Sequence, residues 1–151
     1  MARRLVLSGV LLLSSCSSSV TESTPGPDPS VSVGATPGCY TVLLGGTPVA
    51  DVSLPALVEL THDPALSFVD PGRFAVKEPG ASQPRAPISW WAPDSGGTLQ
   101  LVLGGGYTGY SFSLQPAGGG SWSGKGAYFA DFGVEPKPAP LPVRLIPRSC
   151  P

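Results

Sequence analysis

The sequence has little of what metal-binding and nucleic-acid-binding proteins use. It contains one histidine, three cysteines and only 13% charged residues. A single histidine is not a cluster of metal ligands, and no acidic loop has the spacing of a calcium site. The formal net charge is −1, and no basic patch of the kind that nucleic acid requires is present. We therefore expect no metal, no cofactor and no nucleic-acid partner.

Long apolar runs and helical periodicity are also missing. The longest apolar run, residues 5–13, is nine residues long and is broken by Ser8 and Gly9. A membrane-spanning helix needs about 20 apolar residues, so this run is too short to be one. The 20 glycines and 19 prolines interrupt nearly every stretch long enough for a helix. Helices are therefore not expected to build this protein.

The N-terminal residues have the layout of an export signal. Arg3 and Arg4 precede the apolar run, and small residues follow it before Cys16. The segment Leu13–Cys16, with the letters LSSC, resembles the lipobox of bacterial lipoproteins. The resemblance implies cleavage before Cys16 by the lipoprotein signal peptidase and diacylglycerol on the Cys16 sulfur. An ordinary secretory signal that happens to contain a cysteine is the alternative.

A flexible tether is expected after the lipidated cysteine. Residues 17–37 contain 15 Ser, Thr, Pro or Gly residues among 21 and have no aromatic residue. Such a segment buries too little apolar surface to fold, and its mean reach is about 25 Å. We predict a signal peptide at 1–15, the lipidated cysteine and tether at 16–37, and one domain at 38–151. Ser17 resembles the outer-membrane-sorted class, so we expect an extracytoplasmic protein, anchored to the outer membrane if the cell has two membranes.

The two remaining cysteines, Cys39 and Cys150, lie near the ends of the domain. In an exported protein they can form a disulfide, because extracytoplasmic compartments are oxidising. A bridge closes a loop of 112 residues, for which the loop-entropy relation gives about 4.7 kcal/mol. We predict this disulfide, which requires the first and last strands to be neighbours. Two free thiols, or half of a metal site, are the alternative.

Strand patterns run through the domain. Residues 73–77 alternate strictly, with Phe74 and Val76 on one face, and residues 98–103 and 110–114 alternate in the same way. Period two is the signature of half-buried strands. Less regular stretches complete a set of about eight: residues 39–44, 57–62, 88–91, 121–129 and 142–146.

Glycine- and proline-rich turns separate these stretches at short intervals. This spacing favours an antiparallel meander. We predict an all-β fold of about eight short strands, closed or nearly closed as a small barrel, with a β-sandwich as the alternative. Gly124 and Gly126, inside a strand pattern, are expected to supply sharp bends.

Two glycine-rich patterns match the residue spacing of nucleotide-binding motifs but lack other features that these motifs require. Residues 104–109 fit G-x-G-x-x-G, but an alternating stretch, residues 110–114, follows where the motif requires a helix. Residues 119–125 fit G-x-x-x-x-G-K, but Gly126 stands where a Ser or Thr would bind magnesium. We interpret both as glycine turns between strands.

The case for catalysis is weak. His62 is followed by Asp63 and could act as a base, but no G-x-S-x-G pattern marks a nucleophilic serine. Among the scattered acids only Asp131 has an aromatic setting, and we interpret it as an exposed acid in a turn. We therefore predict no catalytic residue.

The aromatic residues are the remaining signal, and all twelve lie in the domain. Adjacent residues face opposite sides of a strand, so Trp90 and Trp91 are expected to point in opposite directions. Core packing explains most aromatic side chains, and a ligand pocket or contact face is the sharper interpretation. The candidates for such contacts are Trp90, Trp91, Tyr107, Tyr110, Trp122 and Tyr128.

Scattered segments of the domain are similar to small β-rich lipoproteins of GC-rich bacteria: Gly38–Tyr40, Ser89–Trp91 and Pro147–Cys150. This resemblance implies no activity and transfers no site residue. The only basic cluster, Arg144 and Arg148, is too sparse to indicate a site.

These observations favour a non-catalytic binding or interaction module. Its partners would be the membrane, through the lipid anchor, and either an envelope protein or a small apolar ligand. By analogy of fold class with lipocalin-like barrels, a ligand would enter the barrel mouth. A structural envelope protein without a ligand is the first alternative, and an envelope hydrolase is the second.

Overall fold

A computed structural model describes residues 37–65, 71–85, 89–105, 107–131 and 138–151. The expected signal peptide, Cys16 and almost all of the tether fall in residues 1–36 and lie outside the described residues. Lipidation and cleavage at Cys16 therefore stay predictions. Within the described ranges, no helix is long and apolar enough to cross a membrane.

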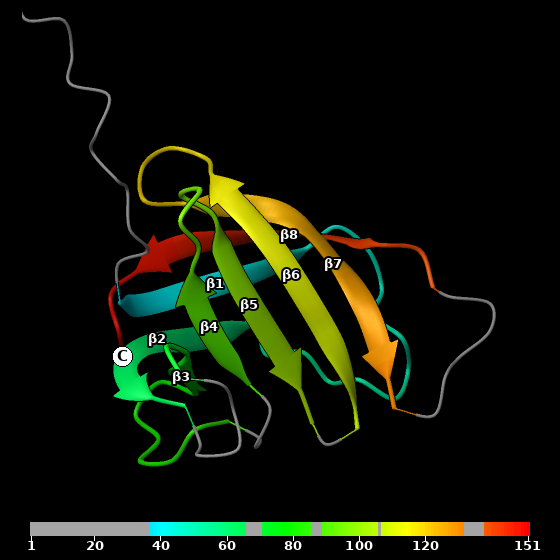
Figure 1. Cartoon of the computed structure of the whole chain (residues 1–151), viewed down its shortest axis with the longest axis horizontal. Helices are drawn as coiled ribbons and strands as arrows, with labels where there is room; N and C mark the ends of the chain where they lie inside the picture. Colours follow the sequence, from blue (N-terminus) through cyan, green and yellow to red (C-terminus); the bar gives the residue numbers. More distant parts are fainter. Residues whose placement is uncertain (1–36, 66–70, 86–88, 106, 132–137) are drawn as a thin grey trace, which may run out of the picture. The chain divides into compact units, whose positions relative to one another are not determined.

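Eight antiparallel strands form a closed barrel (Figure 1). They are β1 (Gly38–Leu44), β2 (Leu57–Pro64), β3 (Phe74–Lys77), β4 (Trp90–Pro93), β5 (Leu99–Gly104), β6 (Thr108–Pro116), β7 (Trp122–Ala130) and β8 (Leu141–Arg148). Each strand pairs with the next along the chain, and β8 pairs with β1. In Figure 1, β4 to β7 run side by side, and β1, β2 and β8 cross them at a steep angle. The predicted all-β barrel is confirmed, and the β-sandwich alternative is wrong.

The alternating sequence patterns become facing pairs of core side chains. Leu101 of β5 stands opposite Phe112 of β6, and Leu103 stands opposite Tyr110. All four are at most 1% exposed. Their polar neighbours in β6, such as Ser111, are exposed. Period two therefore sorts apolar residues to the inside of this barrel and polar residues to the outside.

Side chains fill the interior of the barrel. An eight-stranded barrel is just wide enough for its inward-facing side chains to pack its interior. The largest fully buried side chains include Trp91, Tyr110, Phe112, Leu60, Leu99, Leu101, Leu103, Leu114 and Leu145. They belong to one hydrophobic cluster that is contributed by strands around the whole barrel. The interior is thus a packed core.

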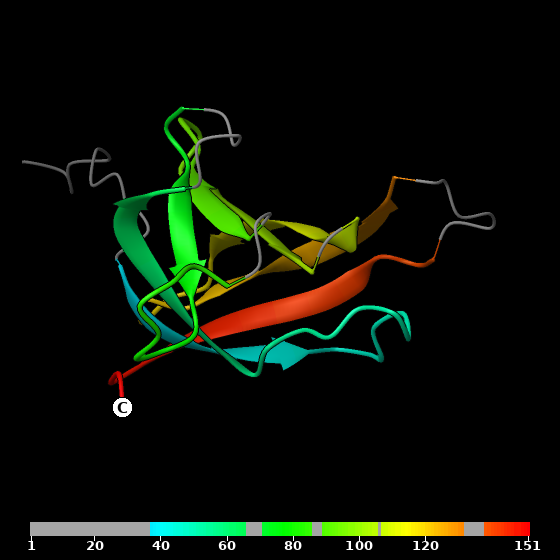
Figure 2. The same cartoon turned by 90° about the horizontal axis from the view of Figure 1, so that it is seen from below.

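Closure depends on the first and last strands. Figure 2 shows β8 running alongside β1, and their antiparallel pairing extends from Cys39 opposite Arg148 to Leu44 opposite Val143. The disulfide between Cys39 and Cys150 joins the start of β1 to a position just after β8, with 5.2 Å between the Cα atoms. Both the predicted disulfide and the predicted pairing of these strands are confirmed.

Glycines in β7 allow β6 to approach closely. A Cβ at Gly126 would lie 2.4 Å from the ring of Phe112, and a Cβ at Gly124 would lie 2.0 Å from the carbonyl oxygen of Ser113. Phe112 is the cross-strand partner of Gly126, so its ring occupies the space left by the missing side chain. The structure thus shows that these glycines allow close packing between β6 and β7. The sharp bends expected at Gly124 and Gly126 stay a prediction.

Both glycine-rich motifs form turns, as interpreted from the sequence. Residues 104–109 connect β5 to β6, with residue 106 outside the described part. Residues 117–121 connect β6 to β7, and Gly118, Gly119 and Gly120 have φ angles of 83°, 57° and 73°. Positive φ at three successive positions is accessible to glycine at little steric cost.

The loop between β1 and β2, residues 45–56, packs against the core at the end of the barrel opposite the disulfide. Val52 is buried, and Val49 lies against the core cluster. The Val49 N–H donates a 3.0 Å hydrogen bond to the Tyr110 hydroxyl. The hydroxyl of Tyr128 donates to Asp51 Oδ2, also at 3.0 Å. Both side-chain hydrogen bonds hold this loop against the end of the barrel.

Candidate functional site

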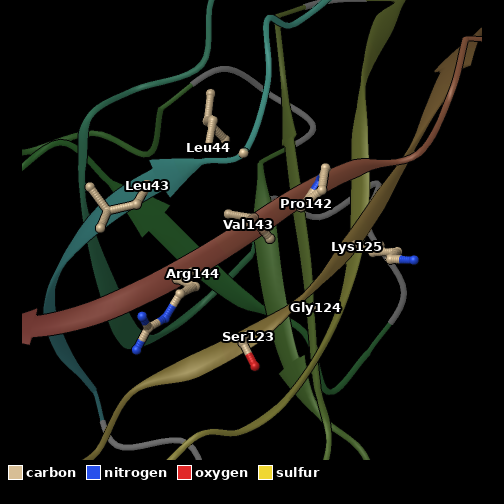
Figure 3. A pocket seen from close by; sticks show the side chains of 9 residues that line it. Leu43, Leu44, Ser123, Gly124, Lys125, Pro142, Val143 and Arg144 are labelled. Carbon is tan, nitrogen blue, oxygen red and sulfur yellow. The ribbon is translucent and has the colours of Figure 1, made fainter.

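A groove of about 510 Å³ crosses the outer face of β1, β8 and β7 (Figure 3). Small-ligand sites have volumes of about 300–1,000 Å³. We call it the β8 groove. Its lining residues are Leu43, Leu44, Gly45, Ser123, Gly124, Lys125, Pro142, Val143 and Arg144.

The first wall of the β8 groove is a row of residues on three neighbouring strands. Leu43 of β1 stands opposite Arg144 of β8, which stands opposite Ser123 of β7. Figure 3 shows these three residues following one another across the strands. Their neighbours Leu44 and Val143 pack with the core, so period two directs the wall residues outward. Leu43 is 46% exposed, which is unusual for a leucine in this barrel.

The second wall is the next outward-facing row, Gly45, Pro142 and Lys125. Lys125 stands opposite Pro142, and the Gly45 N–H donates a 2.8 Å hydrogen bond to the Pro142 carbonyl. A Cβ at Gly45 would lie 2.9 Å from the Pro142 Cβ, so a side chain there would displace the proline. The β1 side of the groove is therefore apolar, and its two cations lie on the β7 and β8 side.

Ion pairs engage cations on the β2 to β4 side of the barrel. Lys77 of β3 pairs with Asp63 of β2, and Arg85 pairs with Glu78. Those acids neutralise the positive charge locally. The positive charges of Lys77 and Arg85 are therefore less available to an anionic ligand.

Lys125 and Arg144 of the β8 groove have no ion-pair partner among the residues that the structure describes. None of the described residues that line the groove is acidic. The register places these two residues diagonally on neighbouring strands, a relationship in which residues are about 7–8 Å apart. Figure 3 shows the two side chains extending away from each other, so both would have to turn toward the space between them to contact the same anionic group.

The backbone in the groove is already hydrogen-bonded. The β1–β8 and β7–β8 ladders run through its lining, and Gly45 extends the first of them. A closed barrel has no free strand edge here to which another strand could be added. The polar groups open to a ligand are therefore the side chains of Ser123, Lys125 and Arg144.

A second cavity of about 320 Å³ lies beside the disulfide. It is lined by Pro37, Gly38, Cys39, Tyr40, Gly119, Gly120, Pro147 and Arg148. Its one charged side chain, Arg148, donates from Nε to the Ser149 carbonyl at 3.3 Å. This cavity offers one partly engaged cation and is a weaker candidate than the β8 groove.

Three of the six candidate aromatic residues belong to the core. Trp91, Tyr110 and Trp122 are at most 2% exposed. The Trp91 indole donates a 2.8 Å hydrogen bond to the Thr61 carbonyl. The Tyr110 hydroxyl accepts a hydrogen bond from the Val49 N–H of the β1–β2 loop. These side chains have core packing and fixed partners, and none lines the β8 groove.

The other three candidate aromatic residues lie at different places on the barrel. Trp90 is half-buried on the outside, with the Arg73 guanidinium 3.7 Å from the centre of its ring. Tyr107 is 67% exposed in the β5–β6 turn. Tyr128 is half-buried and packs edge-on against Tyr110. The structure confirms that Trp90 and Trp91 point in opposite directions. Trp90, Tyr107 and Tyr128 do not form one aromatic contact face.

His62 stands at the end of β2 in an aromatic setting. Its ring centroid lies 5.5 Å from that of Phe74 and 6.2 Å from that of Trp91. The neighbouring groups have other partners: the Thr61 hydroxyl donates to the Ala75 carbonyl at 3.1 Å, and Asp63 pairs with a lysine. Among the described residues, no hydrogen bond joins His62 to a serine or to an acid. Asp131, the other acid singled out, is exposed just after β7.

Two tyrosine hydroxyls have raised pKa values. Burial raises the pKa of Tyr40, and a hydrogen bond with the Trp122 side chain partly opposes that effect. Loss of hydration raises the pKa of Tyr128, and the hydrogen bond and negative charge of Asp51 raise it further. Tyrosine ordinarily titrates near pH 10. Both hydroxyls therefore keep their protons at neutral pH and act as hydrogen-bonding groups.

The described ranges contain no cluster of three or more His, Cys, Asp or Glu side chains that could hold a metal ion. Comparison of the chain with protein-family models, curated proteins and solved structures finds no match. The candidate site therefore depends on the geometry of this barrel.

Sequence reasoning missed most of the β8 groove. It noted Arg144 only as part of a sparse basic cluster and Lys125 only as the last residue of a glycine-rich pattern, and it did not single out Leu43. One signal was available: in residues 142–146, Pro142, Arg144 and Ile146 alternate with the buried Val143 and Leu145. That alternation places Arg144 outside, but it does not identify the residues beside it on other strands.

Proposed function

We propose that this protein is a lipid-anchored, extracytoplasmic binding module of the cell envelope that has no catalytic activity. The lipobox-like segment Leu13–Cys16 supports the anchor. The disulfide supports an oxidising compartment, because such bonds persist mainly outside the cytoplasm. The tether would leave the barrel at Gly38, beside that disulfide.

The packed interior favours binding on the outer wall over binding inside the barrel. Trp91, Tyr110 and Phe112 fill the centre, and the β1–β2 loop packs onto the end opposite the disulfide. A ligand entering as in a lipocalin would have to displace these side chains. The β8 groove needs no such rearrangement, because its wall residues Leu43 and Arg144 are already exposed.

One observation carries the proposal of a binding function. The β8 groove combines an exposed leucine with two cations that no described acid neutralises. A structural barrel without a ligand gains little stability from this combination. The structural role remains the second candidate, and the fully packed core favours it.

The anchor can be tested by fractionating cells that express the wild type or Cys16→Ser in the presence of labelled palmitate. We expect the wild type to carry label and to pellet with membranes, and the variant to lose both properties. A variant that still pellets, or a wild type without label, would contradict the lipid anchor.

The groove can be tested separately with a photocrosslinking residue at Leu43 and a matched one at exposed Ser111 on β6. We expect adducts in cells from position 43 only, and we expect Arg144→Gln to remove them. The purely structural role would be favoured if both positions gave equal amounts of adduct, or if Arg144→Gln left the amount of adduct at position 43 unchanged.

A further inference from the structure

We infer that the β8 groove binds an anionic lipid, with its phosphate or carboxylate head between Arg144 and Lys125 and its aliphatic chain toward Leu43. This inference rests on the proposed binding function and names the ligand class. The two ends of the groove differ in chemistry as the two ends of such a molecule do.

The head group is assigned from the cations. Arg144 and Lys125 lie diagonally on β8 and β7, and Ser123 stands directly opposite Arg144. An arginine can bind two oxygens of a phosphate or carboxylate at once, and a lysine adds a second positive charge. The serine hydroxyl adds a further donor. Among the described lining residues, no acidic side chain competes for these groups.

The chain is assigned from the apolar wall. Leu43 is 46% exposed and lies beside Arg144 in the first row, and Pro142 lies in the second row. A methylene chain between these rows would cover both side chains, and removing this apolar surface from water favours binding. Gly45 at the β1 end adds no polar side chain, and it packs closely against Pro142 of the second row.

Other ligand classes fit the lining less well. A peptide brings N–H and C=O groups that need partners, and the backbone of β1, β7 and β8 is already paired with itself. Sugar rings and unstacked nucleic-acid bases are held largely by aromatic faces, and none of the described residues that line the groove is aromatic. A lipid chain carries no polar group along its length, so it leaves none unsatisfied.

The test uses three probes that separate the two ends of the ligand. Dodecyl phosphate has both the anion and the chain, dodecyl maltoside has the chain alone, and inorganic phosphate has the anion alone. The detergents are used below their critical micelle concentrations with the full chain carrying Cys16→Ser, which removes the protein's own lipid. Calorimetry gives the dissociation constants. Amide chemical shifts of Leu43, Ser123 and Lys125 locate the binding.

We expect dodecyl phosphate to bind at least tenfold more tightly than either single-feature probe and to shift the groove amides. Arg144→Gln should weaken its binding at least tenfold, and Leu43→Ser should weaken it several-fold. Arg85→Gln, which removes a paired guanidinium from the other side of the barrel, is the matched control and should change nothing. Unchanged thermal unfolding verifies that each variant is folded.

Several outcomes would overturn the inference. Equal binding of inorganic phosphate would show a simple anion site, and equal binding of dodecyl maltoside would show unspecific apolar contact. Tighter binding of an acidic peptide such as oligoglutamate at the same amides would replace the lipid by a protein partner. That last outcome would leave the proposed binding function intact, whereas the crosslinking at Leu43 tests that function independently.

Discussion

The ring of Phe112 on β6 occupies the space where a side chain on Gly126 of β7 would begin. A Cβ at position 126 would lie 2.4 Å from two carbons of that ring. Phe112 is fully buried, and its neighbours in the core are also tightly packed. The ring therefore cannot move aside without disturbing the centre of the barrel.

Gly126→Ala is expected to destabilise the barrel by about 1–3 kcal/mol, the usual cost of overpacking a filled core. Chemical denaturation monitored by tryptophan fluorescence measures this loss. Gly96→Ala is the control, because a Cβ at that position meets nothing within 4 Å. Combining Gly126→Ala with Phe112→Leu should recover part of the loss caused by the clash. If Gly126→Ala has no more effect than Gly96→Ala, the close packing of β6 on β7 is wrong.

Trp91→Phe and Trp90→Phe are expected to differ in cost although the two residues are adjacent. Trp91 is 1% exposed and donates a hydrogen bond to the Thr61 carbonyl. Its replacement leaves a cavity and an unpaired buried acceptor, at a cost of about 1–3 kcal/mol. Trp90 lies outside under Arg73, and its replacement should cost less than about 1 kcal/mol. Equal losses in urea unfolding would contradict the placement of these side chains.

The strands and their closure followed from local signals in the sequence. Alternation in residues 98–103 and 110–114 depends only on which neighbours are apolar, and burial then fixes the inside face. The pair Cys39 and Cys150 was identified by cysteine count and compartment, without any geometry. Both kinds of inference are independent of how distant strands align, which is why they agree with the structure.

The β8 groove depends on alignment between distant strands and could not be read from the sequence. Leu43, Ser123 and Arg144 are far apart along the chain and become neighbours only through the registers of β1–β8 and β7–β8. The packing of Val49 and Val52 over the barrel end was also missed, because the β1–β2 loop has no regular apolar period. Such contacts are set by tertiary packing.

Stability is expected to fall as the pH rises above about 10, and Tyr40→Phe should make that fall shallower. The folded pKa of Tyr40 is raised by burial, whereas the unfolded chain titrates near 10. Below pH 10 both states keep the proton, so this tyrosine causes no pH dependence there. Above pH 10 the unfolded state loses its proton first, which lowers the free energy of unfolding.

Urea unfolding of both proteins between pH 8 and pH 11 measures the Tyr40 effect. Tyr40→Phe also loses the hydrogen bond with Trp122, so a constant loss of about 1 kcal/mol is expected at every pH. The informative quantity is therefore the slope against pH. Identical slopes in the two proteins would contradict the raised pKa of Tyr40.

The Cys39–Cys150 bridge is expected to stabilise the folded domain by about 2–4 kcal/mol, less than the loop-entropy value. It links residues 111 positions apart, but β1 and β8 also hold each other through six cross-strand residue pairs. The double variant Cys39→Ala, Cys150→Ala should therefore fold with a lower melting temperature. For a domain of about 100 residues, each kcal/mol corresponds to roughly 4–8 °C.

Calorimetry with and without reductant measures the shift, and peptide mapping under non-reducing conditions verifies the bond. Two results would contradict this role of the disulfide. Reductant would leave the melting temperature of the wild-type protein unchanged, or peptide mapping would find both cysteines as free thiols.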